Sequence, residues 1–122
     1  MVITMTEDDK MLYRMKNMAD IRTELEKHID NIAEQLIAQQ LEDNLQDVID
    51  DAIDAQLYID LSTKEPVGFD IGIVIGGPNI RLIYSRGACQ LRGWWGSLND
   101  IKDVDNEICE TILDYLTEIY RQ

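Results

Sequence analysis

The first half of the chain has a helical pattern of apolar positions. Residues 8–60 contain no glycine and no proline, and they are rich in residues that favour helices. Two apolar series recur at spacings of three and four, interrupted only at Arg22: Met11, Met15, Met18, Leu25, Ile29, Ile32 and Leu36, then Leu41, Leu45, Val48, Ala52, Ala55 and Ile59. The phase shift between the series predicts a break near residues 39–44 and two helices packed as a hairpin. One long helix with a skip, or a coiled-coil dimer, is the alternative.

The next segment alternates with a period of two, which is typical of strands. Residues 69–75 place isoleucine at every second position after Phe69, and similar runs follow at 80–84 and 89–95. Gly-Gly-Pro-Asn at 76–79 and Ser-Arg-Gly at 85–87 have the chemistry of turns. The pattern predicts a three-stranded antiparallel meander within residues 67–96, with an apolar face that needs a cover.

Residues 103–120 are expected to form a final helix. Asp103 or Asp105 can cap its start. Its apolar stripe consists of Val104, Ile108, Ile112, Tyr115, Leu116 and Ile119. The fold predicted for residues 1–122 is therefore a single α+β domain with two N-terminal helices, three strands and a C-terminal helix. The length of the chain fits one domain.

The chain is strongly acidic, with 24 acidic residues, 11 basic residues and a formal net charge of −13. A field of this sign repels nucleic acids and membrane surfaces and accelerates encounter with a basic partner. Direct binding to nucleic acid or to a membrane is therefore not expected.

The compartment expected from the sequence is the cytoplasm. No stretch approaches the roughly 20 apolar residues that span a bilayer, and the first ten residues lack the features of a secretory signal. Cys89 and Cys109 are the two cysteines. We expect both to be buried, reduced thiols, because disulfides are rare in that compartment.

The acidic residues form two rows at helical spacing. The acids of the first row are spaced by four, three and four, so they would share one helix face: Asp43, Asp47, Asp50 and Asp54. Asp51 lies beside this row and is expected to contribute to the same surface. The second row follows Asp103 on the last helix: Glu107, Glu110, Asp114 and Glu118. Neighbours in such a row lie about 5–6 Å apart, close to the spacing of phosphates along a nucleic-acid strand. The rows are either solvated faces or surfaces that present phosphate-like charge to a nucleic-acid-binding protein.

No residue pattern indicates catalysis. His28 is the single histidine, and it has no second histidine or cysteine pair with metal-ligand spacing. The glycines at 76–77 precede a strand rather than a helix, so they do not match a phosphate-binding loop. We therefore expect a binding protein with no catalytic residues, no cofactor and no metal, rather than an enzyme.

Two adjacent tryptophans follow Arg92 and Gly93. Adjacent strand residues point to opposite faces, so Trp95 is expected to face the core and Trp94 to face outward. An outward tryptophan is a frequent interface anchor. It can equally be covered by a helix of the same chain.

The Gly-Gly-Pro-Asn turn at 76–79, the Gly-Trp-Trp-Gly strand end at 93–96 and the acidic closing helix together resemble the small accessory proteins of bacteriophages. In size and acidity the chain is similar to phage anti-CRISPR proteins. That resemblance implies a stoichiometric inhibitor in the host cytoplasm that docks on the nucleic-acid channel of a Cas effector. Its acidic rows would occupy places meant for phosphates. The alternative is a structural or adaptor module that self-associates as a homodimer through residues 11–36.

Overall fold

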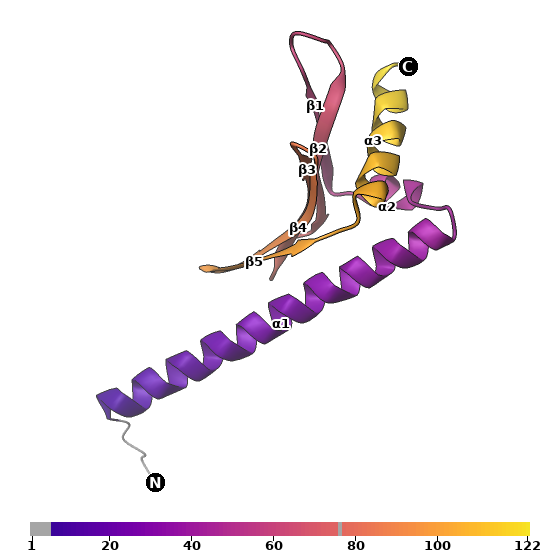
Figure 1. Ribbon diagram of the computed structural model, residues 1–122. Helices are drawn as coiled ribbons and strands as arrows, with labels where there is room; N and C mark the ends of the chain where they lie inside the picture. Colours follow the sequence, from indigo (N-terminus) through magenta and orange to yellow (C-terminus); the bar gives the residue numbers. More distant parts are fainter. Residues whose placement is uncertain (1–5, 76) are drawn as a thin grey trace.

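The computed structural model describes residues 6–75 and 77–122 of the chain (Figure 1). Helices and strands follow one another in the order α1 (Glu7–Leu41), α2 (Gln46–Asp50), β1 (Asp54–Ile59), β2 (Pro66–Val74), β3 (Asn79–Ser85), β4 (Ala88–Trp95), β5 (Leu98–Asp103) and α3 (Asn106–Tyr120). Within the described residues the strands form one antiparallel sheet of five strands, and their order in the sheet is their order in the chain. The α+β class is as expected.

The predicted three-stranded meander and helical hairpin are wrong. Helix α1 ends at Leu41, inside the interval expected for a break, but the helix after it has only five residues. Residues 54–59, predicted to be helical, form strand β1 instead. Pairing with β2 satisfies the backbone of this segment, and Leu57 and Ile59 are half-buried while Tyr58 between them is exposed. Such tertiary pairing overrides intrinsic helix propensity.

The second strand absent from the prediction is β5, which runs antiparallel to β4. A two-residue turn at Gly96 and Ser97 joins them, and Gly96 has a φ of 62° that suits glycine at the first turn position. Asp103 therefore belongs to β5 and not to the last helix. Asp105 is the cap of α3, because its carboxylate accepts a hydrogen bond from the backbone N–H of Glu107 at 3.0 Å.

The three expected strands are present as β2, β3 and β4. A two-residue turn at Arg86 and Gly87 closes the β3–β4 hairpin, and both residues have positive φ, of 53° and 77°. This geometry matches the right-handed twist of the two strands. Of the predicted turn at 76–79, Gly76 lies outside the described residues, and Gly77 has a φ of 77°.

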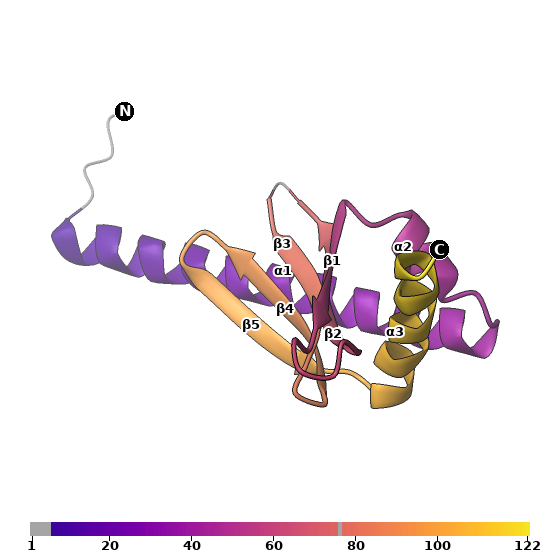
Figure 2. The same cartoon turned by 90° about the horizontal axis from the view of Figure 1, so that it is seen from above.

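Both long helices lie on the same face of the sheet (Figures 1 and 2). Helix α1 crosses β4 and β5, and α3 packs on β2 and β4. The core between them is built from hydrophobic side chains, the most deeply buried of the described ones being Leu25, Ile29, Leu36, Phe69, Ile71, Ile80, Leu82, Leu91, Ile108 and Ile112. Helix α1 comes closest to the sheet at Gly93, where an added Cβ would lie 2.8 Å from Cδ1 of Ile29.

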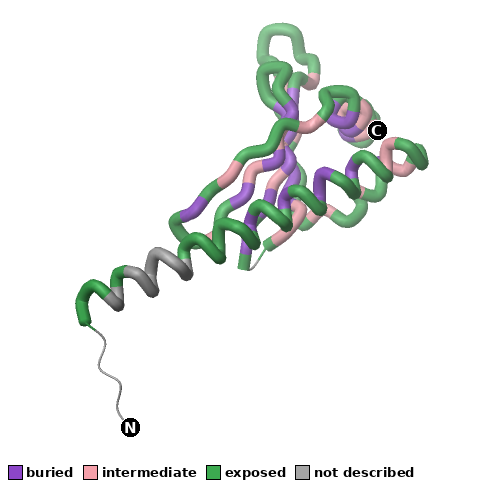
Figure 3. Tube along the Cα trace, turned by 60° about the horizontal axis from the view of Figure 1, so that its bottom comes forward, coloured by how far each residue is buried: buried purple, intermediate pink, exposed green. Residues whose placement is uncertain are grey.

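The first half of α1 extends beyond the sheet (Figures 1 and 3). Among the α1 residues whose burial the structure describes, the first buried one is Leu25 and the last is Leu36. Before that point Met11, Met18 and Ile21 are exposed, whereas the side chain of Met15 lies outside the described residues. The single apolar series predicted for residues 11–36 thus contains a part packed on the sheet, from Leu25 to Leu36, and two exposed members before it, Met11 and Met18.

A disulfide joins Cys89 of β4 to Cys109 of α3, with the two Cα atoms 5.9 Å apart. Both cysteines are buried, as expected, but they are not the reduced thiols that the sequence predicted. The bond fixes α3 on the helix-covered face of the sheet.

Reduction of this disulfide is expected to lower the free energy of unfolding by about 3 kcal/mol, because the bond closes a loop of 20 residues in the unfolded chain. Denaturant unfolding with and without reductant measures the change. The double variant Cys89→Ala/Cys109→Ala serves as the control, since reductant should not affect it. An unfolding midpoint that is the same in both conditions for the natural chain would contradict the prediction.

Candidate partner-binding surface

The acidic residues of the second row lie together on α3. Glu107, Glu110, Asp114 and Glu118 are all exposed, and the helix Asn106–Tyr120 contains no basic residue. Its opposite side is apolar and covers the sheet through Ile108, Ile112 and Leu116. Helix α3 therefore presents a uniformly negative face to solvent.

The acids of the first row are not on one helix face, because α2 is too short to carry them. Asp43 lies in the turn after α1 with a φ of 55°, Asp47 is in α2, and Asp51 follows α2 as its C-terminal cap. Asp50 is the last residue of α2. All of these acids are exposed, and α2 contacts α3. We call Asp43, Asp47, Asp50 and Asp51 with the four α3 acids the acidic end of the molecule.

Asp54 does not belong to the acidic end, although it was predicted to lie in the first row with Asp43, Asp47 and Asp50. It lies on β1, where its carboxylate pairs with Nη2 of Arg81 at 2.5 Å. Nε of Arg81 also pairs with Asp70 on β2 at 2.5 Å. Gly72 leaves room for the guanidinium, because a Cβ at Gly72 would lie 2.9 Å from Nη1 of Arg81.

These contacts shift the titration of both partners. The hydrogen bond from Arg81 is the main cause that lowers the pKa of Asp54 below its ordinary value of 3.8. The same bond is the main cause that raises the pKa of Arg81. Asp54 is thus a neutralised carboxylate that ties β1 to β3, not a free charge for a partner.

The substitution Arg81→Gln is expected to return the pKa of Asp54 toward 3.8. Because the folded-state pKa is depressed, the ion pair stabilises the fold above pH 3.8, and this contribution is lost as the pH falls through the folded-state pKa. Carboxyl NMR titration of both proteins measures the shift. Arg22→Gln, on the exposed surface of α1, is the control with the same change of charge. Equal Asp54 pKa values in the natural chain and Arg81→Gln would contradict this account.

The bases nearest to the acidic end in the chain are engaged elsewhere. Lys102 pairs with Asp30 at 3.0 Å, and Arg121 pairs with Glu65 at 2.7 Å. Within the part of the chain that the structure describes, no ion pair reaches the carboxylates of the acidic end. Among the described residues, no base neutralises these carboxylates.

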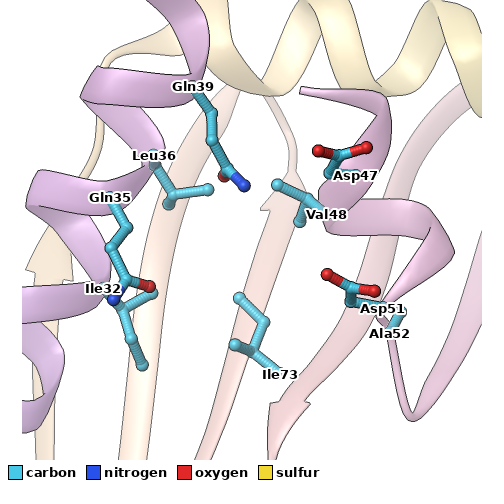
Figure 4. Close-up of a pocket in the computed structure, with 9 residues that line it drawn as sticks. All are labelled: Ile32, Gln35, Leu36, Gln39, Asp47, Val48, Asp51, Ala52 and Ile73. Atoms are coloured by element: carbon cyan, nitrogen blue, oxygen red, sulfur yellow. The ribbon is translucent and has the colours of Figure 1, made fainter. Parts of the chain in front are cut away.

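A cleft of about 150 Å³ opens between α1 and α2 at the acidic end (Figure 4). Gln35 and Gln39 line it on the α1 side, and Asp47 and Asp51 line it on the other. The apolar lining consists of Ile32, Leu36, Val48, Ala52 and Ile73. Neither glutamine was predicted from the sequence as part of a site. The sequence shows that they are four residues apart in a helical segment, but it does not show that Asp47 and Asp51 lie opposite them.

Trp94 is exposed on β4, and Trp95 is half-buried against the core beside His28, with ring centroids 6.1 Å apart. This alternation confirms the predicted directions. Trp94 pairs with Asn99 across the β4–β5 hairpin near its turn, whereas α3 begins beyond the other end of β5. The structure therefore separates Trp94 from the acidic end.

Within the described residues, no three His, Cys, Asp or Glu side chains are grouped so as to hold a metal ion. No described helix combines the length and the apolar character needed to cross a membrane. No protein-family model matches the chain, and neither a curated protein nor a solved structure matches it.

Proposed function

We propose that this protein is an inhibitor that binds a basic, nucleic-acid-binding protein through its acidic end and blocks access of the nucleic acid. The observation that supports this function is the set of exposed carboxylates on α3, to which no base is paired in the described chain. Adjacent acids on that face are about 5–6 Å apart, a spacing that a surface adapted to successive phosphates can accept.

The row is unfavourable for the isolated helix, since like charges at spacings of three and four oppose each other by roughly 0.2–0.5 kcal/mol per pair. A basic surface removes this repulsion when it binds. The net charge of −13 would also steer the protein toward such a surface. This net charge also exceeds the magnitude of about 2–8 that keeps a small domain soluble.

The most specific form of the proposal follows from the resemblance to phage anti-CRISPR proteins. The partner would then be a host defence nuclease of the Cas effector type, whose nucleic-acid channel is positively charged. The acidic end would occupy that channel. Trp94, on the uncovered face of the sheet, would lie outside this contact.

Neutralising the α3 row is expected to weaken partner binding roughly tenfold or more without loss of stability. The variant is Glu107→Gln/Glu110→Gln/Asp114→Asn/Glu118→Gln. Its matched control removes four exposed charges from α1: Asp20→Asn/Glu24→Gln/Glu26→Gln/Glu34→Gln. The immobilised proteins are incubated with host lysate, washed at rising salt and then challenged with a short nucleic-acid duplex.

The proposal requires that the natural chain and the α1 control retain the same nucleic-acid-binding protein, that the α3 variant does not, and that salt and the duplex release it. A captured protein that the duplex cannot displace, or that the α3 variant holds equally well, would rule out competition with nucleic acid.

Self-association through α1 is a second candidate function, favoured by the exposed Met11, Met18 and Ile21. Sedimentation of the natural chain and of Met18→Asp tests it. A dimer that this substitution dissociates supports an assembly module, and a natural chain that sediments as a monomer excludes it.

A further inference from the structure

We infer that the cleft between α1 and α2 is a socket for an arginine side chain of the partner protein. This inference rests on the proposed function, because it names the contact by which the acidic end would hold a basic surface. The acidic end would then hold its partner through a defined pocket for one residue type, and not only through a diffuse attraction between charged surfaces.

The two walls of the cleft are complementary to a guanidinium group (Figure 4). Asp47 and Asp51 are four residues apart, so their carboxylates stand one turn apart, and both point into the cleft toward α1. Gln35 and Gln39 are likewise one turn apart on the facing helix. One wall of the cleft thus supplies carboxylate oxygens, and the facing wall supplies carboxamide oxygens.

The remainder of the cleft is apolar. Leu36 of α1, Val48 of α2 and Ile73 of β2 line it beneath the polar groups. Arginine and lysine bury the methylene groups of their side chains along apolar surface while they keep the charged head among polar groups. A cation without such a stem, a metal ion for example, would leave this surface in contact with water.

Arginine fits the polar groups better than lysine does. A guanidinium has five N–H donors in a plane and can bond two carboxylates and a carboxamide at once, whereas an ammonium has three donors around a compact, strongly hydrated charge. Four acceptor-bearing side chains in a space of about 150 Å³ match the larger number of donors.

The cleft also has the charge that this occupant requires. Asp47 and Asp51 make no ion pair with any described base, and residues 41–60 contain seven acids and no base. Asp43 and Asp50, which are exposed and close to Asp47 and Asp51 in the chain, add to the negative potential of this end of the molecule. An arginine would neutralise carboxylates that the fold itself leaves uncompensated.

The test titrates the whole protein, followed by ¹⁵N–¹H NMR, with three blocked amino acids: N-acetyl-arginine methylamide, the lysine equivalent and the citrulline equivalent. Citrulline has almost the shape of arginine without its charge. We expect saturable shifts at residues 32–39 and 46–52 with arginine, shifts requiring several-fold more ligand with lysine, and none with citrulline. Equal responses to arginine and citrulline, or shifts spread over all acidic surfaces, would overturn the inference.

Two variants and a matched control identify the groups involved. Asp47→Asn/Asp51→Asn should weaken the affinity for blocked arginine at least roughly tenfold, the usual effect of losing a charge-assisted bond. Glu110→Gln/Asp114→Asn removes the same charge at the same spacing from α3 and should change the affinity less than about twofold. Ala52→Leu fills the cleft without changing charge and should also prevent binding. Equal losses in the two charge variants would show nonspecific attraction only.

The inference and the proposed function fail separately, because this titration needs no partner. Arginine binding in the cleft of a protein that captures no nucleic-acid-binding partner would support the socket and contradict the proposed inhibitor. Capture of such a partner, with no arginine-induced shifts up to the solubility limit of the ligand, would support the proposed inhibitor and contradict the arginine socket.

Discussion

The substitution Gly68→Ala is expected to unfold the protein or to lower its free energy of unfolding by about 4 kcal/mol or more. A Cβ at position 68 would lie 2.2 Å from the carbonyl oxygen of Tyr84, which is backbone on the neighbouring strand. No rotamer change can relieve this overlap, so β2 and β3 would have to separate. Circular dichroism during thermal and denaturant unfolding measures the loss.

The control is Gly96→Ala, at a position where no atom lies within 4 Å of the added Cβ. Gly96 has a positive φ, so alanine there should cost only about 1–2 kcal/mol, the usual penalty of the left-handed conformation. If both substitutions cost the same, close packing at Gly68 would not explain its effect.

Leu25→Asp is expected to have an effect of similar size, about 3–5 kcal/mol, because it places an unpaired carboxylate where the side chain is fully buried. Cδ1 of Leu25 would lie 2.9 Å from a Cβ at Gly93, which puts this leucine at the point where α1 meets β4. The variant should lose its cooperative unfolding transition and its dispersed NMR spectrum.

Met18→Asp, seven residues earlier on the same helix, should leave the free energy of unfolding of the monomer nearly unchanged, because Met18 is 49% exposed. Comparing Leu25→Asp with Met18→Asp therefore distinguishes an effect on folding from an effect on self-association. A protein that tolerates aspartate at position 25 as well as at position 18 would contradict the packing of α1 on the sheet.

The strand segments that alternate regularly were predictable from the sequence, and the two edge strands were not. β2, β3 and β4 have buried faces and strong turn residues between them. The segment that contains β1 has apolar residues at 52, 55 and 59 that also fit a helix, and β5 is mostly polar. A strand at the edge of a sheet is specified largely by its neighbour, which a single sequence does not reveal.

The candidate site was predicted in part for the same reason. The four acids of α3 lie on one exposed face as predicted, because the observed helix Asn106–Tyr120 falls within the predicted range 103–120. Asp54 was misassigned because the sequence places Arg81 far from it, although the sheet brings the two within bonding distance. The cleft could not be predicted, since Gln35 and Asp51 face each other only after the chain reverses at residues 42–45.

The agreement between strand order and chain order also bears on how the molecule folds. Each strand pairs with its neighbour in sequence, so the sheet can grow by local steps from the tightly turned β3–β4 hairpin. Docking of α1 on the sheet instead joins segments that are far apart in the chain, such as Ile29 and Gly93, and requires a larger loss of loop entropy than the hairpins do. We therefore expect the sheet to dominate the folding transition state. Changes at the α1 contact would then mainly accelerate unfolding, so the docked helix sets how long the folded molecule persists.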